Sequence, residues 1–282
     1  MLVKDCFDLY ERQHLNPSTV APGRALRAWG YLQPFFGHLY PDEIKENHIK
    51  DYQRQRDWAG VAPTTVNREL GVLRSALNWC AKREHISAVS YIPNFSEVRR
   101  RERVLDKGEI ARFLTASQRF PYVYKFYMLA LFTAQRRGAI LDLTWDRVDF
   151  RRRSIDFRDP DMYLAARRKG RAHVPMHEKL HALLTLMHEQ RHCDHVIEHK
   201  GMRLPAGTLQ YGWQEVRKDA GLSDDVTPHV IRHTVATDQC ANGVEIAFIA
   251  QLLGHKSIRT TEQIYIKRNP DHLAGAISTM DY

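Results

Sequence analysis

Apolar residues recur at every third or fourth position through residues 1–88, which is the spacing of amphipathic helices. We therefore predict helices over residues 3–15, 24–39, 41–60 and 64–86, with Pro34 expected to kink or break the second of them. The stripe is clearest in the last helix, at Val66, Leu70, Leu73, Leu77 and Cys80. Helices that no strand interrupts predict a small helical domain.

This spacing stops at residues 89–103, where Pro93 and Asn94 predict a loop and a run of arginines follows. We interpret residues 96–103 as a basic linker between one domain over residues 1–95 and a second over residues 104–282. A charge run is usually a solvated surface. In a chain this basic, contact with phosphate is an equally good interpretation.

The second domain combines helical stripes with short alternating segments. Strands are predicted within residues 148–157 and 161–176, with turns at 151–153 and at Lys169-Gly170, and a further strand within 195–204. Helices are predicted over residues 106–117, 121–145, 178–192, 206–221, 228–241, 244–255, 258–267 and 270–282. The fold class predicted for the whole chain is therefore mainly α with a small antiparallel β-sheet.

Charge and composition narrow the class of partner and the cellular compartment that we expect. The 282 residues include 42 lysines and arginines against 33 acids, a formal net charge of +9, which predicts an anionic partner: nucleic acid first, a membrane surface second. The four cysteines form no C-x-x-C pair, which predicts free thiols in a reducing compartment. Because the sequence shows no signal peptide and no long apolar run, we expect a cytoplasmic protein that does not enter the membrane.

Zinc binding is one alternative chemistry. The stretch HEQRHCDHVIEH brings together several potential ligands, namely His188, His192, Cys193, His195 and His199. His188 and His192 would lie one helical turn apart, but no second cluster supplies the spacing of a tetrahedral site. We therefore predict no metal, and a metal-binding regulator is the weakest function considered.

One segment near the C-terminus combines a histidine and an arginine on a single helix. In TPHVIRHTVATDQCANG, residues 227–243, Thr227-Pro228 predicts a helix start and Asn242-Gly243 a stop. His229 and Arg232, three residues apart, then share one face. Because a helix N-terminus already attracts anions, this pair predicts an anion site.

Four more reactive side chains lie in other segments. Arg136 comes late in an apolar helix, in TAQRRGAILDLTW, and is preferred to Arg137 because it directly follows TAQ. Lys169 lies at the tip of the predicted hairpin, His255 follows a glycine expected to end a helix, and Tyr265 comes ten residues later.

Together these residue types fit phosphoryl transfer without a metal ion. Arginines neutralise charge on the non-bridging phosphate oxygens, and a tyrosine hydroxyl attacks phosphorus to form a phosphotyrosine. Lysine or histidine moves the protons. The sequence contains no glycine-rich phosphate loop, so nucleotide hydrolysis is not indicated and no cofactor is predicted.

At these residues the sequence resembles the tyrosine recombinase (phage integrase) family. HVIRHT resembles its H-x-x-R-H box, LLGHKSIRTTEQIY its L-G-H…Y box, TAQRRGAILDLTWDRVDF its first arginine box, and VNRELGVLRSALNWC the last helix of its core-binding domain. The resemblance runs over about residues 5–275. It implies an N-terminal helical, SAM-like core-binding domain and a mixed α+β catalytic domain that together form a C-shaped clamp on DNA.

The resemblance also implies the catalytic set Arg136, Lys169, His229, Arg232, His255 and Tyr265. The two arginines are expected to clamp the scissile phosphate while Tyr265 attacks it, leaving a 3′-phosphotyrosine and a free 5′-hydroxyl. Lys169 is expected to protonate the leaving oxygen. His229 is expected to assist deprotonation of the tyrosine or hold a phosphate oxygen, and His255 to donate a hydrogen bond to the phosphate. Neither metal nor ATP is needed, because a second strand's hydroxyl reverses the step.

The implied function is site-specific strand exchange on double-stranded DNA at attachment or core-type sites, with integration or excision of a phage or mobile element as the first choice. Its implied partners are other copies of the chain in a homotetramer, docked through residues 270–282, and accessory DNA-bending or directionality proteins. Its implied location is the nucleoid. Chromosome-dimer resolution, relaxation like that of a type IB topoisomerase and a silent DNA-binding homologue are the alternatives.

Two departures from the family pattern bear on these expectations. The first arginine box often has an acid three residues after its arginine, and here that residue is Ala139. The hairpin is rich in arginine, so Arg167 or Arg168 is an alternative to Lys169.

Overall fold

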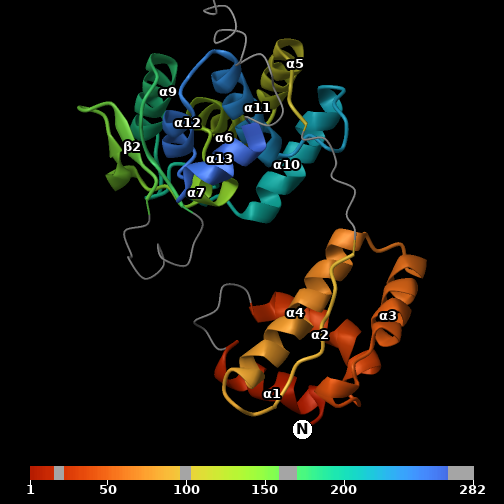
Figure 1. Ribbon diagram of the computed structural model, residues 1–282. Coiled ribbons are helices and arrows are strands. Elements are labelled where there is room, and N and C mark those ends of the chain that lie inside the picture. Colours follow the sequence, from red (N-terminus) through yellow and green to blue (C-terminus); the bar gives the residue numbers. More distant parts are fainter. Residues whose placement is uncertain (16–21, 96–102, 159–169, 266–282) are drawn as a thin grey trace, which may run out of the picture. The chain divides into compact units, whose positions relative to one another are not determined.

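The computed structural model describes residues 1–15, 22–95, 103–158 and 170–265, and the chain divides into two compact units, Met1–Arg100 and Arg101–Tyr282 (Figure 1). Each unit has a hydrophobic core of its own. Within the described residues, none of the helices combines the length and apolar character needed to cross a membrane. The prediction of a mainly helical fold with small antiparallel sheets is confirmed.

The secondary-structure elements described in the first unit are all helices. Its elements are α1 (Val3–Gln13), α2 (Pro22–Phe36), the short 3-10 helix η1 (Pro41–Glu43), α3 (Glu46–Trp58) and α4 (Pro63–Ala81). Helix α4 packs against α1, α2 and α3, and its apolar stripe of Val66, Leu70, Leu73 and Leu77 is fully buried. The stripe in the sequence therefore marks the face on which the unit is assembled.

The structure refines the helix boundaries expected in this unit. Helix α2 continues past Pro34 to Phe36, so the proline does not break it; in this last turn it removes only the hydrogen bond that its own N–H would have donated one turn back. The predicted helix 41–60 is divided, since Ile44 takes an extended backbone that buries its side chain in the core. The helix restarts after Lys45, whose backbone N–H donates to the His48 ring.

The second unit is built around α6 (Pro121–Thr133), which is apolar on nearly every side. It is surrounded by α5 (Lys107–Ser117), α7 (Arg137–Leu141), α9 (Glu178–Glu189), α10 (Ala206–Asp219) and α11 (Pro228–Ala241). Helices α12 (Ile246–Leu252) and α13 (Ile258–Tyr265) pack on each other and on α11. At the C-terminal end of α6, Ala134 is buried in a small cluster with Ala236 of α11 and Ile249 of α12.

The predicted helix 121–145 is wrong at its centre. Helix α6 ends at Thr133 with Ala134 as its C-cap, whose φ of +53° is left-handed, and α7 begins only after Arg136. A 3-10 turn, η2 (Trp145–Arg147), follows. A non-glycine residue in this conformation carries strain, so contacts elsewhere in the fold must hold it there.

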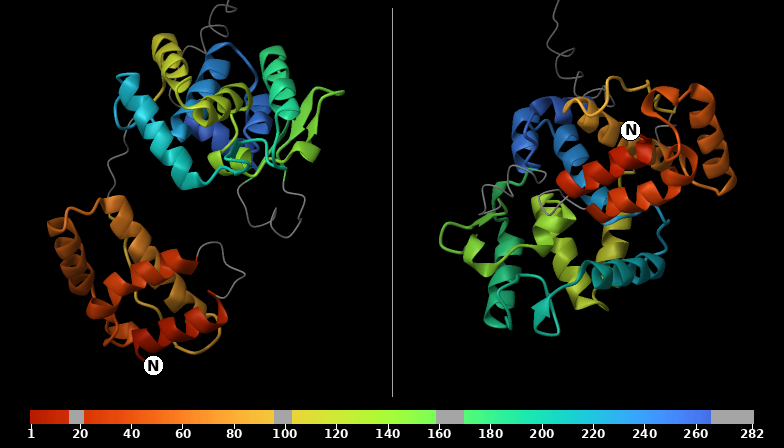
Figure 2. Two further views of the ribbon diagram at one scale, coloured as in Figure 1. Left: turned by 180° about the vertical axis from the view of Figure 1, so that it is seen from behind. Right: turned by 90° about the horizontal axis from the view of Figure 1, so that it is seen from below.

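Two small antiparallel sheets complete the unit. Strands β1 (Val148–Asp149), β2 (Ser154–Asp156) and β3 (His173–Pro175) pair in that order, with Ile155 opposite both Val148 and Val174. Strands β4 (Glu198–His199) and β5 (Met202–Arg203) form a hairpin. Figures 1 and 2 show the three-stranded sheet at the edge of the unit away from α10.

Candidate active site

Arg232 is the best-anchored cation of the site. It lies in the second turn of α11 and is only 3% exposed. Its Nη1 donates to the carbonyl of Ala134 at 2.8 Å and its Nη2 to that of Leu253 at 2.8 Å. These carbonyls belong to the C-cap residues of α6 and α12. The helix dipole is negative at these ends and favours a cation there. Two helix ends thereby stabilise one buried guanidinium.

His255 lies beside this guanidinium. Its Nε2 is 3.0 Å from Nη2 of Arg232, and its Nδ1 is 2.8 Å from Oγ1 of Thr261 on α13. Burial, with further contributions from Arg232 and Arg136, lowers the pKa of His255 to about 4. The ring is therefore neutral at physiological pH.

Arg136 is the residue immediately before α7, rather than a residue late in a long helix as the sequence suggested. The helix break at Ala134 turns it toward the hairpin, where its Nη1 donates to the carbonyl of Gly170. Burial lowers the pKa of Arg136, although a guanidinium stays charged at any physiological pH. Arg137, the alternative, is exposed and donates to Oε1 of Gln210 at 3.4 Å.

A close backbone contact joins the hairpin to the turn before His255. A Cβ on Gly170 would lie 2.2 Å from the Gly254 carbonyl oxygen. Gly254 has a φ of +61°, and a Cβ there would lie 2.7 Å from the backbone carbon of Arg171. Neither position has room for a side chain, so glycine at both allows the hairpin to reach the site.

Asp142 also anchors this hairpin, through Arg171. Its Oδ2 accepts from Nη2 of Arg171 at 2.6 Å and its Oδ1 from Nη2 of Arg203 at 2.6 Å. Burial opposes ionisation, but these two hydrogen bonds outweigh it and keep the pKa of Asp142 below its ordinary value. Ala139, where the family often has an acid, is buried in the apolar core.

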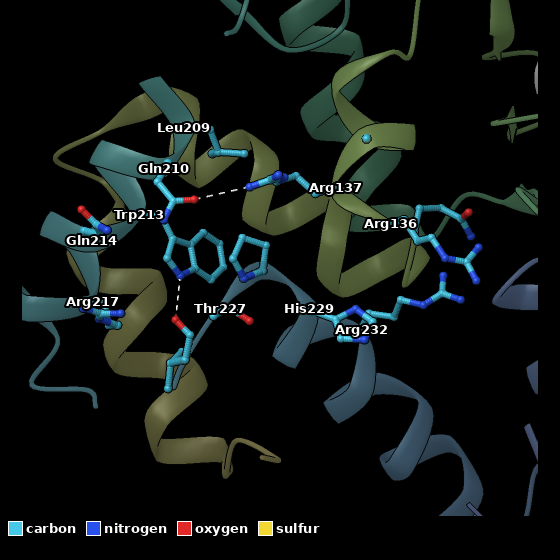
Figure 3. A pocket seen from close by; sticks show the side chains of 14 residues that line it. Arg136, Arg137, Leu209, Gln210, Trp213, Gln214, Arg217, Thr227, His229 and Arg232 are labelled. Atoms are coloured by element: carbon cyan, nitrogen blue, oxygen red, sulfur yellow. Dashed lines mark hydrogen bonds between the residues drawn. The ribbon is translucent and has the colours of Figure 1, made fainter. Parts of the chain in front are cut away.

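A pocket of about 410 Å³ lies beside the two arginines (Figure 3). Gln135, Arg136, Arg137, His229 and Arg232 line it together with residues of α10. His229 is exposed, in the first turn of α11, whereas Arg232 is one turn deeper. The pocket therefore offers an accessible space bounded by several cationic or polar groups.

The remaining predicted residues are described only in part or not at all. Tyr265 is the last residue of α13, and its backbone alone is described. Lys169 and its alternatives Arg167 and Arg168 lie outside the described residues, as does the segment 270–282. In the histidine-rich stretch His192 pairs with Glu198 at 3.0 Å, and no group of three metal-ligating side chains is found among the described residues.

Sequence reasoning missed four residues that build the site. They are Gln135, Asp142, Gly170 and Thr261. Gln135 is buried and donates to the carbonyl of Leu252 at 2.6 Å, which ties the break after α6 to the end of α12. Gln135, Asp142 and Gly170 act through partners far away in the sequence, and Thr261 acts through His255, six positions earlier, so the spacing of apolar residues carries no signal for these contacts.

Comparison with known proteins assigns the class. The model of the phage integrase family matches residues 103–272. The chain therefore belongs to the phage integrase family of tyrosine-type, site-specific recombinases.

Among its relatives is the tyrosine recombinase XerC of Thermodesulfovibrio yellowstonii, 24% identical over 92% of this chain and 91% of the relative. The XerC of Chlamydia caviae is 43% identical, but over only 22% of this chain and 20% of that protein. The higher identity is therefore confined to one segment.

Solved structures share the fold at low sequence identity. An integrase fragment of the Tn1549 transposon, in complex with transposon right end DNA, superposes with a TM-score of 0.79 at 17% identity, over 99% of both chains. The lambda integrase tetramer bound to a Holliday junction superposes with a TM-score of 0.75 at 18% identity, over 94% of this chain and 77% of that one.

Proposed function

We propose that this recombinase cuts and rejoins double-stranded DNA through a 3′-phosphotyrosine. The main support is the convergence of Arg136 and Arg232, two partly or fully buried guanidinium groups from distant helices, beside one pocket. A guanidinium matches two phosphate oxygens at once, and a desolvated one stabilises developing negative charge more strongly than an exposed one. In this proposal the two arginines hold the scissile phosphate.

The other roles follow from position. His229 faces the pocket from the exposed first turn of α11, where it assists the nucleophile or holds a phosphate oxygen. Because Nε2 of His255 accepts from Nη2 of Arg232, its role in this proposal is to orient that guanidinium toward the phosphate rather than to donate to the phosphate itself. Tyr265 attacks phosphorus and breaks its bond to the 5′ oxygen, which takes a proton from Lys169. Lys169 directly precedes Gly170, whose carbonyl accepts from Arg136, and this supports its assignment.

DNA is the partner that this chemistry and the net charge of +9 favour. We infer that residues 1–95 form a core-binding domain, 96–103 a basic linker and 104–282 the catalytic domain, and that both domains contact the duplex. Assembly as a homotetramer through residues 270–282, with accessory proteins, belongs to the same proposal. The structures of Tn1549 integrase with DNA and of the lambda integrase tetramer support it by shared fold.

We propose integration or excision of a phage or mobile element as the biological outcome. Chromosome-dimer resolution is a second candidate, favoured by the XerC relative that aligns over 92% of this chain. The two differ in where the DNA site lies. The first predicts sites at the ends of the element that encodes the protein, and the second predicts a single site on the host chromosome.

Nicked duplexes test the chemistry. Bound duplexes are selected from a random-sequence library, mapped to the host genome, and rebuilt with a nick that lets the 5′-hydroxyl fragment diffuse away. Wild type and Tyr265→Phe are incubated with them in EDTA, and covalent protein–DNA product is measured on a denaturing gel. Arg136→Ala and Arg232→Ala are tested beside them, with DNA binding measured by gel shift.

A covalent band in wild type that Tyr265→Phe lacks is the expected result, and its formation in EDTA means that no metal is needed. Each arginine variant is expected to lower the rate of band formation by about 100-fold or more. Good binding without a band in wild type would contradict the proposed cleavage and favour a silent DNA-binding protein. Failure to select any sequence would contradict site-specific binding itself.

A further inference from the structure

Thr261 has a buried hydroxyl next to the candidate site. The residue is fully buried on α13, and its Oγ1 lies 2.8 Å from Nδ1 of His255. It lies inside the L-G-H…Y box but is not one of the residues that the box names. A buried polar group usually has a structural reason for its place, and here its partner is a ring that also contacts Arg232.

The direction of this hydrogen bond follows from Arg232. A guanidinium only donates, so Nε2 of His255 must accept from Nη2 of Arg232. A neutral imidazole with a free electron pair on Nε2 carries its proton on Nδ1. The Nδ1–H therefore donates to the hydroxyl oxygen of Thr261, and both ring nitrogens of His255 have partners.

This places Thr261 at the end of a chain of hydrogen bonds across the site. The ends of α6 and α12 hold Arg232, Arg232 holds the ring of His255, and the ring holds Thr261. Thr261 in turn belongs to α13, and Tyr265 follows it in that helix after four residues, about one turn. Two hydrogen bonds through the His255 ring thus link the helix of the nucleophile to the guanidinium of the phosphate site.

We propose that Thr261 is a positioning residue of this recombinase, which holds the His255 ring in one orientation and keeps α13 in register with Arg232. The inference rests on the proposed cleavage by Tyr265. Its physical basis is that misplacing a reacting group by about 1 Å costs about 100-fold in rate. The hydroxyl is required and the methyl group is not, because only the hydroxyl accepts from Nδ1–H.

The first test concerns the ring and needs no DNA. Uniform isotope labelling of histidine lets nuclear magnetic resonance distinguish a protonated from an unprotonated ring nitrogen, and loss of a signal in His255→Gln assigns it. In wild type and Thr261→Ser we expect a slowly exchanging proton on Nδ1 and an unprotonated Nε2. In Thr261→Val we expect this proton to exchange at least about tenfold faster, because its acceptor is gone.

The second test concerns cleavage. Thr261→Val is expected to slow formation of the covalent band on nicked duplexes by about 10- to 100-fold, with DNA affinity within about threefold of wild type, and Thr261→Ser to restore the rate to within about threefold. Thr133→Val is the matched control. Thr133 is equally buried, and its hydroxyl donates to the Leu129 carbonyl one turn back in α6.

Each outcome decides the proposal. The proposal is supported if Thr261→Val shows slow cleavage and fast exchange while Thr261→Ser and Thr133→Val do not. Circular dichroism checks that every variant is folded. A Thr261→Val protein that keeps the protected Nδ1 proton, or that cleaves as fast as Thr133→Val, would overturn it. If wild type itself forms no covalent band, the proposed cleavage fails, while the ring measurement still reports whether Thr261 orients His255.

Discussion

At the scale of single residues, the site depends on charges that are buried before any ligand arrives. Arg232 is 3% exposed, and removing a cation from water is costly unless fixed dipoles replace the hydration. The carbonyls of Ala134 and Leu253 supply such dipoles at 2.8 Å. The guanidinium therefore already holds its orientation, and a phosphate would meet donors that need little rearrangement.

The buried, neutral ring of His255 predicts a pH effect on stability. Its pKa is about 4 in the folded protein, below the value of 6.5 for an unperturbed histidine. The unfolded chain therefore takes up a proton first as the pH falls. This histidine contributes stability that is present at pH 7 and is lost between about pH 6.5 and pH 4, by up to about 3 kcal/mol.

Urea unfolding of wild type and His255→Gln at a series of pH values measures this contribution. The difference in unfolding free energy between the two proteins is expected to shrink from pH 7 to pH 4. His173→Gln, an exposed change in the same unit, controls for the substitution. A difference that stays constant with pH would contradict a neutral, buried ring.

Glu69 in the first unit is a second residue whose burial predicts a large effect. It is 6% exposed, accepts from the Tyr52 hydroxyl at 2.7 Å, and accepts from Arg56 at 2.6 and 3.0 Å. Replacing it with glutamine leaves the guanidinium without its charged partner. We expect Glu69→Gln to lower the unfolding free energy of the first unit by about 3 kcal/mol.

Chemical denaturation followed by tryptophan fluorescence checks this value. Glu46→Gln, which removes a solvent-exposed pair with Lys50, is the control and is expected to unfold like wild type. Equal stability of the two variants would mean that Glu69 is not held as described.

At the scale of elements, the site forms where three chain segments meet. The break between α6 and α7 presents Arg136, the end of the hairpin presents Gly170, and the turn after α12 presents His255. Their contact is made by backbone at Gly170 and Gly254, which lets the segments come closer than side chains allow. The geometry of the site thus depends on two positions that have no side chain.

Gly254→Ala is expected to lower the unfolding free energy by more than the backbone strain alone would, because it also disrupts this contact. Alanine at a left-handed position costs about 1 kcal/mol, and the overlap with Arg171 adds about 1 to 3 kcal/mol. Gly243→Ala is a matched control, because Gly243 has a φ of +77° and a Cβ added there would meet no atom within 4 Å. Thermal unfolding of both variants measures the difference, and equal losses would argue against a close contact.

Asp142→Asn is expected to loosen the hairpin without unfolding the unit. The change removes the negative charge of the carboxylate, whose two oxygens accept from Arg171 and Arg203, both at 2.6 Å. Hydrogen exchange at β3 amides should then become about tenfold faster. Asp146→Asn, at an exposed position of η2, is the control and should leave the exchange unchanged. Unaltered protection of the β3 amides in Asp142→Asn would show that Asp142 does not hold the hairpin in place.

At the scale of the whole molecule, the described residues of each unit form a main core that shares no residue with that of the other unit, and the second unit has a further small cluster around Ala134. The core of the first unit is built from α1 to α4, and that of the second unit surrounds α6. Cooperative folding requires a continuous core, so each unit has what it needs to fold alone.

Separately expressed chains of residues 1–95 and 103–282 are therefore expected to fold. Each should give a single cooperative thermal transition by calorimetry, within a few degrees of the matching transition in the full chain. Aggregation or absence of a transition in one of them, while the full chain melts normally, would show that the units depend on each other.

The sequence predicted the parts whose signals are local. Thr227-Pro228 and Asn242-Gly243 mark the ends of the helix that carries His229 and Arg232, and that helix is observed as Pro228–Ala241. The break at Ala134 was not predicted, because no glycine or proline marks it. It is held by Arg232, whose hydrogen bond to the Ala134 carbonyl spans 98 positions of the chain.

Because Arg232 supports two helix ends as well as the pocket, position 232 limits how this protein can lose its activity through mutation. A neutral side chain there would weaken the fold together with the phosphate binding that we propose for Arg232, and an unstable product is removed by proteases before it acquires another role. Loss of the Tyr265 hydroxyl alters one atom and none of these helix ends. A descendant that still binds DNA but no longer cuts it is therefore expected to have lost its tyrosine and kept its arginine.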